Sequence, residues 1–103
     1  MNSGSRSDWQ DLPSIVSESL IRRFVYWDQQ PQVGMHYGIE LYTRLKSYPI
    51  NQRLRAYDAA HSCADKNLNT CITVSSTEYT VWLSLRSLSA NPEAVKDLEI
   101  YTG

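Results

Sequence analysis

The stretch that decides the fold is TCITVSSTEYTVWLSLRS, residues 70–87, which can form either one helix or two strands joined by a turn. Its second half alternates two sets of side chains, a period of two that is typical of a strand. The apolar set is Tyr79, Val81, Leu83 and Leu85, and the alternate set is Thr80, Trp82 and Ser84. The first half is short and β-branched, and SSTE suits a hairpin loop. The pattern therefore predicts a β-hairpin near 70–86, with strands at 70–75 and 78–86. A helix is the alternative, because tertiary context can override local preference.

Three helices are expected before this hairpin. Residues 12–30, LPSIVSESLIRRFVYWDQQ, carry apolar side chains, Trp27 among them, at spacings of three and four, which predicts the first helix. Residues 35–48 predict the second, although the β-favouring residues and the glycine at 36–43 leave a strand as an alternative. Residues 50–68, INQRLRAYDAAHSCADKNL, predict the third.

The third predicted helix has two uncharged sides. One side is a regular stripe, which we expect to form core, Leu54 included; the stripe consists of Ile50, Leu54, Tyr57, His61, Ala64 and Leu68. The opposite side holds small or uncharged residues, namely Gln52, Ala56, Ala59 and Cys63. This helix is therefore expected to pack on two sides, in the centre of the domain or at a subunit contact.

The predicted fold is α+β and mainly helical, with three N-terminal helices, the β-hairpin near 70–86 and a short C-terminal helix. That last helix begins at Asn91, a suitable N-cap, with Pro92 at its first position. Residues 1–7 are expected to be a mobile tail, and residues 8–103 a single globular domain. The order of elements has the outline of a winged-helix domain in topology alone, and no residue motif accompanies it.

Composition indicates a globular protein, with 42% hydrophobic and 20% charged residues and a net charge of −1. No apolar run approaches the roughly 20 residues that span a bilayer, so no membrane partner is expected. The polar N-terminus lacks the apolar segment of a secretory signal. Cys63 and Cys71 fit free thiols in a reducing compartment, and a cytoplasmic location is expected.

Metal, cofactor and catalytic sites are not expected. The metal-ligating side chains are His36, His61, Cys63 and Cys71. They lack zinc-site spacing, and a helix would turn His61 and Cys63 about 200° apart. Nucleotide-binding and nucleophile motifs are missing from the sequence, and its carboxylates are scattered. We therefore expect a non-catalytic protein; an enzyme with a site assembled from dispersed residues is a third reading.

A basic segment covers residues 22–55, where six Arg or Lys stand against two acidic residues and give a local net charge of +4. Its side chains include types that read base edges in a major groove. The alternative function is therefore a winged-helix-like, DNA-binding transcriptional regulator. Its candidate residues are Arg44, Lys46, Asn51, Gln52, Arg53 and Arg55. The simpler reading is a solvated helix surface.

Trp82 is the candidate anchor of a protein contact. If the apolar set of the hairpin faces the core, Trp82 faces outward between Thr80 and Ser84, and an exposed Trp is a typical interface residue. Coverage of Trp82 by the C-terminal helix, or by the tail through Trp9, is the alternative. The favoured function is thus a small cytoplasmic interaction or regulatory protein that binds a protein partner or itself through Trp82, Thr80 and Ser84.

Overall fold

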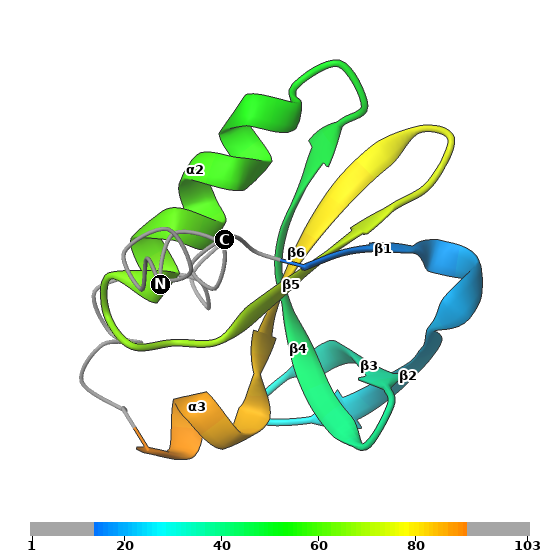
Figure 1. Ribbon diagram of the computed structural model, residues 1–103. Coiled ribbons are helices and arrows are strands. Elements are labelled where there is room, and N and C mark those ends of the chain that lie inside the picture. Colours follow the sequence, from blue (N-terminus) through cyan, green and yellow to red (C-terminus); the bar gives the residue numbers. More distant parts are fainter. Residues whose placement is uncertain (1–13, 91–103) are drawn as a thin grey trace.

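The computed structural model describes residues 14–90, which form a six-stranded mixed sheet with two α-helices and one 3-10 helix (Figure 1). The strands are β1 (Ser14–Ser17), β2 (Arg22–Trp27), β3 (Pro31–Tyr37), β4 (Glu40–Pro49), β5 (Thr70–Val74) and β6 (Glu78–Ser84). The helices are η1 (Glu18–Leu20), α2 (Arg53–Ala64) and α3 (Leu85–Ala90). The predicted tail at 1–7 and the predicted helix from Asn91 lie outside the described residues.

The sheet has the order β1-β5-β6-β4-β3-β2, in which β1 and β5 are parallel and every other pair is antiparallel. The edge strands β1 and β2 are joined by residues 18–21 alone. Such a link spans at most about 18 Å, whereas the edges of a flat six-stranded sheet lie about 24 Å apart. The sheet must therefore curl, and Figure 1 shows η1 turning the chain from β1 toward β2.

The prediction of three N-terminal helices is wrong, because residues 14–49 form β1, η1 and three strands, and the described chain is mainly β. The run Phe24–Trp27 consists of aromatic and β-branched residues, which prefer a pleated surface. The turn residues after it let the chain fold back as a hairpin, and Gln29 takes a positive φ of 67° there. Of the two readings of 36–43, the strand is correct, but a turn with Gly38 at φ +62° divides it into β3 and β4.

The third predicted helix exists as α2, but its predicted core face is wrong. Leu54 is 71% exposed, while Ala56, Ala60 and Cys63 are buried against the sheet. Small side chains allow the helix backbone to approach the strands closely. Of the predicted stripe, Leu54, His61 and Ala64 face solvent, while Leu68, which follows the helix, is buried. The predicted hairpin is confirmed: β5 and β6 pair from Thr70 opposite Leu83 to Val74 opposite Tyr79, with Ser75 in the loop accepting the Glu78 N–H at 3.2 Å.

The core occupies both faces of the sheet. On the face covered by α2, buried side chains form two clusters, Ala56, Ala60, Ile72 and Val81, and Cys63, Leu68 and Leu83. On the other face, Val16, Met35, Cys71 and Trp82 form one cluster. Val16 on β1 and Met35 on β3 share this cluster although three strands separate them in the sheet order. The curl thus turns this second face into an interior.

Candidate protein-binding surface

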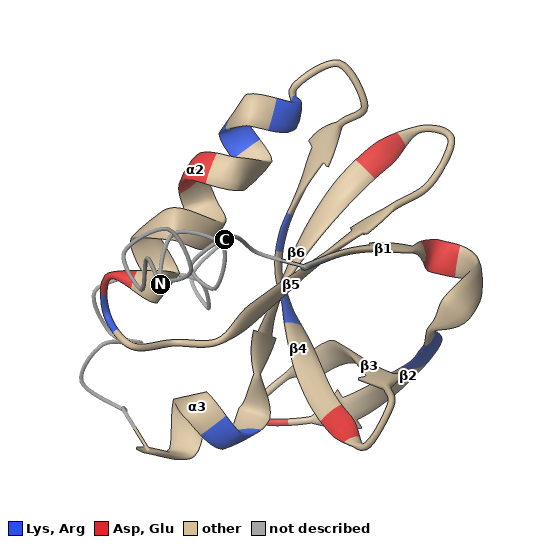
Figure 2. Cartoon of the chain, in the orientation of Figure 1, with Lys and Arg blue, Asp and Glu red and all other residues tan. Residues whose placement is uncertain are grey.

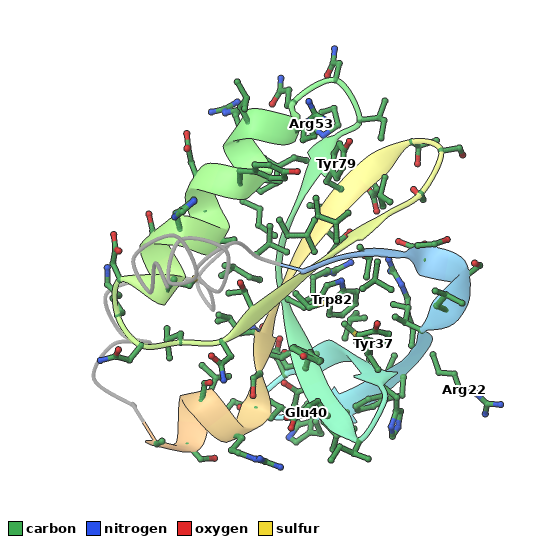
Figure 3. The ribbon with its side chains drawn as sticks, in the orientation of Figure 1. Arg22, Tyr37, Glu40, Arg53, Tyr79 and Trp82 are labelled. Atoms are coloured by element: carbon green, nitrogen blue, oxygen red, sulfur yellow. The ribbon has the colours of Figure 1, made fainter. Side chains whose placement is uncertain are left out.

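The predicted interface residues Trp82, Thr80 and Ser84 are all buried, and Trp82 has 0% exposure. Its indole N–H donates a hydrogen bond of 2.9 Å to Thr73 Oγ1. The predicted outward orientation of Trp82 is therefore wrong (Figure 3). The period of two correctly divided β6 between two faces, but α2 covers one of them and the curl of the sheet encloses the other. An interface role that requires an exposed Trp82 does not fit this burial.

The predicted nucleic-acid residues do not share one surface. Arg44 is opposite Trp82 in the β4–β6 register and so lies on the face away from α2. Lys46 and Arg55 instead line a cleft of about 300 Å³ between β4 and α2. Arg53 has its guanidinium 5.9 Å from the ring centroid of Tyr57. Figure 2 shows the corresponding basic segments at separate places on β4 and α2.

The two polar candidates, Asn51 and Gln52, lie at the start of α2. Asn51 is exposed in the turn that precedes the helix. Gln52 is the N-cap residue, and its Oε1 accepts a hydrogen bond of 3.1 Å from Arg55. The cleft also contains Asp58, which offsets part of its positive charge. The winged-helix topology that motivated the DNA reading does not occur in residues 14–90, where α2 alone among α-helices precedes the hairpin.

A different Trp is exposed. Trp27 on β2 has 73% exposure, and Val25 on the same face of the strand has 71%. In the β2–β3 register Trp27 is opposite Pro31 and Val25 is opposite Val33, so the four side chains adjoin on one face of the hairpin. We call these four residues the hairpin patch. Val33 also packs against the core cluster around Trp82, and the other three side chains form a contiguous exposed surface, unlike scattered single apolar residues.

The other face of the same hairpin is held in place by aromatic contacts. The Phe24 ring lies 5.0 Å from the His36 ring and 5.9 Å from the Tyr26 ring, measured between centroids. Tyr26 donates its hydroxyl hydrogen to Thr43 Oγ1 at 2.6 Å. Gly34 leaves the room that Phe24 occupies, since a Cβ there would lie 2.5 Å from Phe24 Cζ. These contacts fix the hairpin on which the patch is displayed.

The backbone of β2 adds a second feature, because β2 is an edge strand. Within residues 14–90 it pairs with β3 on one side and with no strand on the other. An edge strand presents N–H and C=O groups that can pair with another chain. The hairpin patch and this open edge thus belong to the same strand.

Sequence reasoning missed this surface by placing Trp27 on a helical core face. The sequence feature that indicates this surface is a strand-forming run followed by turn residues. Four aromatic or β-branched residues, 24–27, are followed by DQQP at 28–31 and then by a second short segment, which is the pattern of a hairpin. In a strand, Trp27 and Val25 share a face, whereas on a helix they would diverge.

Within residues 14–90, no group of three or more His, Cys, Asp or Glu side chains is placed to hold a metal ion. Cys63 and Cys71 are unpaired and buried in clusters on opposite faces of the sheet. Burial raises the pKa of each thiol to about 11, so neither has the lowered pKa of a reactive cysteine. None of the helices in this part of the chain is long and apolar enough to cross a membrane.

Comparison of the chain with protein-family models, with curated proteins and with solved structures yields no match.

Proposed function

We propose that this chain is a non-catalytic protein-binding module and that the hairpin patch is its contact surface. The observation that carries the proposal is the exposure of Trp27 and Val25 side by side on an edge strand. A Trp that becomes buried at the centre of an interface typically contributes about 2 kcal/mol or more to binding. The aliphatic neighbours in the patch can exclude water around it.

The rigidity of the hairpin supports the same proposal. Its opposite face is fixed by the Phe24, Tyr26 and His36 contacts, and Arg23 at its base is held by Glu18 Oε2 at 2.7 Å. A surface that is ordered before binding loses less conformational entropy on association. We place the protein in the cytoplasm, a proposal supported by its two unpaired thiols.

Site-specific photo-cross-linking in cells that express the full chain tests this function. A benzoylphenylalanine at position 27 is expected to capture a polypeptide, which mass spectrometry then identifies and which is purified for binding measurements. The matched control is the same probe at Ile39, which is 91% exposed and lies in the turn between β3 and β4. The purified partner is expected to bind at least about tenfold more weakly to Trp27→Ala than to the wild type.

Two results would overturn the proposal. The first is the absence of any cross-link at position 27 beyond those seen at position 39. The second is a captured protein whose measured affinity is the same for Trp27→Ala and for the wild type. Trp27→Ala should keep its fold, since the side chain is largely exposed, and circular dichroism checks this.

Nucleic-acid binding is the alternative function, and one observation favours it: Lys46 and Arg55 line a single cleft with Tyr48. Asp58 in the same cleft and the placement of Arg44 on the other face speak against it. Titration of a labelled mixed-sequence duplex at low salt tests this reading, since DNA-binding proteins retain a non-specific Kd of about 1–100 µM. Absence of binding in that range would eliminate it.

A further inference from the structure

The partner that the edge strand fits best is a second copy of this chain, an inference that rests on the proposed function and specifies it. Strand β2 and the residue after it read Arg22-Arg23-Phe24-Val25-Tyr26-Trp27-Asp28. Basic residues stand at one end of this segment and an acidic residue at the other. A segment of this kind can complement itself when two copies run antiparallel.

The geometry of an antiparallel pair limits the possible registers. Directly opposed residues point to the same face, and successive residues of a strand point to opposite faces. A twofold pair of β2 strands must therefore be centred on a residue rather than between two residues. The centre can then be Phe24, Val25 or Tyr26.

When the pair is centred on Val25, each residue of the strand lies opposite a residue of the second copy that complements it. Arg22 is then opposite Asp28 of the second copy, which pairs opposite charges at both ends of the interface. Phe24 is opposite Tyr26 of the second copy, and Val25 is opposite its own equivalent. On the patch face, Trp27 of the second copy packs beside Arg23, whose guanidinium already lies over an aromatic ring.

The registers centred on Phe24 and on Tyr26 place less complementary residues opposite each other. Centring on Phe24 puts Arg22 opposite Tyr26 and Asp28 opposite the apolar Leu20 of the second copy. Centring on Tyr26 puts Asp28 opposite Phe24. Each of these registers sets the Asp28 carboxylate against an apolar side chain and leaves Arg22 without an acidic neighbour.

The exposure of Arg22 and Asp28 in the single chain agrees with the register centred on Val25. Arg22 and Asp28 are both exposed, and within residues 14–90 neither forms an ion pair. Figure 3 shows Arg22 extending away from the rest of the molecule. Both charges lie at the surface of the described chain, where a second copy can reach them.

We propose that two copies of this chain associate through antiparallel pairing of their β2 strands, with Val25 opposite Val25 and Arg22 opposite Asp28. The pair forms one continuous sheet of twelve strands, because each copy contributes a six-stranded sheet. It also places the two hairpin patches next to each other on one face. Trp27 of each copy then lies opposite Arg23 of the other.

Sedimentation velocity of the full chain, at protein concentrations from about 1 to 200 µM, tests the association. The wild type is expected to form dimers. Arg22→Asp and Asp28→Arg each replace an attraction with a repulsion at both ends of the interface, and each should raise the dimer Kd at least about tenfold. The double variant R22D/D28R restores opposite charges and should return the Kd to within about threefold of the wild type.

A cysteine at the axis provides an independent readout. Val25→Cys brings two thiols together at the twofold centre and should form disulfide-linked dimers on mild oxidation. Ile39→Cys, equally exposed but away from the proposed contact, is the matched control and should stay monomeric under the same oxidation. The native thiols do not interfere, since Cys63 and Cys71 are buried.

Several outcomes would overturn the pairing. A monomeric wild type at 200 µM would do so, as would a dimer that both single charge variants leave intact. A double variant no better than the single ones would exclude the register. The proposed function fails separately: a monomeric wild type whose position 27 still cross-links to another protein would refute the self-pairing alone.

Discussion

Arg23 on the edge strand β2 lies over the indole ring of Trp82 on β6, with its guanidinium carbon 5.2 Å from the ring centroid. The same guanidinium donates a hydrogen bond of 2.7 Å to Glu18 Oε2 on η1. These contacts join the link between the two edge strands to the centre of the sheet. Trp82 thus lies in the core cluster on the inner face of the curl, and the cation above it belongs to the edge strand.

Trp82→Ala should reduce the free energy of unfolding by about 3–5 kcal/mol, because it removes a fully buried aromatic ring and leaves Thr73 Oγ1 without its donor. Chemical denaturation measures the loss. Trp27→Ala is the matched control: it removes the same side chain from an exposed position and should change stability by less than about 0.5 kcal/mol. Equal losses in the two variants would contradict the assignment of one Trp to the core and the other to the surface.

Gly34→Ala should destabilise the protein by about 1–3 kcal/mol, because its new Cβ meets the Phe24 ring at 2.5 Å. The ring must move and then loses its contacts with Tyr26 and His36. A double-mutant cycle identifies the cause. In a Phe24→Ala background, Gly34→Ala should have little effect, since the clash is gone. A loss of the same size in both backgrounds would place the strain elsewhere.

Because Cys63 and Cys71 are buried, we expect the free energy of unfolding to fall at alkaline pH. Burial raises the pKa of Cys63 and of Cys71 from 9.0 to about 11. Above pH 9 the unfolded chain releases these protons while the folded chain keeps them, so stability falls from pH 9 to pH 11. At pH 10 the expected loss is on the order of 1 kcal/mol per thiol. Urea titrations from pH 8 to 10 measure the slope.

Cys63→Ala and Cys71→Ala provide the control for that slope. Each variant can shift the stability at every pH, but each should also remove about half of the slope that the thiols produce. Burial also raises the pKa of Tyr42 and Tyr48, so these groups add to the fall mainly above pH 10. An unchanged slope in both Cys variants would show that the thiols are not responsible.

The parts of the fold that were predictable from sequence have strong local patterns. The alternation along 78–84 identified β6, and SSTE identified its turn, because both are determined by neighbouring residues. The helix at 53–64 was also predictable, as it lacks glycine, proline and long β-branched runs. Its buried face was not, because the choice between a face of small residues and a face of larger ones depends on how closely the sheet approaches.

The N-terminal half was not predictable from periodicity, because the curled sheet buries side chains on both faces. Met35 belongs to the core on one face and Thr43 is buried on the other, so the apolar residues of β2 to β4 follow no clean period of two. Chance spacings of three and four then imitate a helix. The curl results from the short link between β1 and β2, whose effect depends on a sheet order that no local pattern encodes.

Leu54 and Ala60 on α2 test the assignment of the helix faces. Leu54→Ala should change the free energy of unfolding by less than about 0.5 kcal/mol, because the side chain is exposed. Ala60→Leu should reduce it by about 1–3 kcal/mol, because Ala60 is buried in a cluster with Ile72 and Val81 and the extra atoms have no room. Both variants place Ala or Leu on the same helix, so intrinsic helix preference changes little between them. Denaturant titration of the two variants measures the difference. A large loss for Leu54→Ala together with a neutral Ala60→Leu would restore the face that the sequence stripe predicted and turn α2 about its axis.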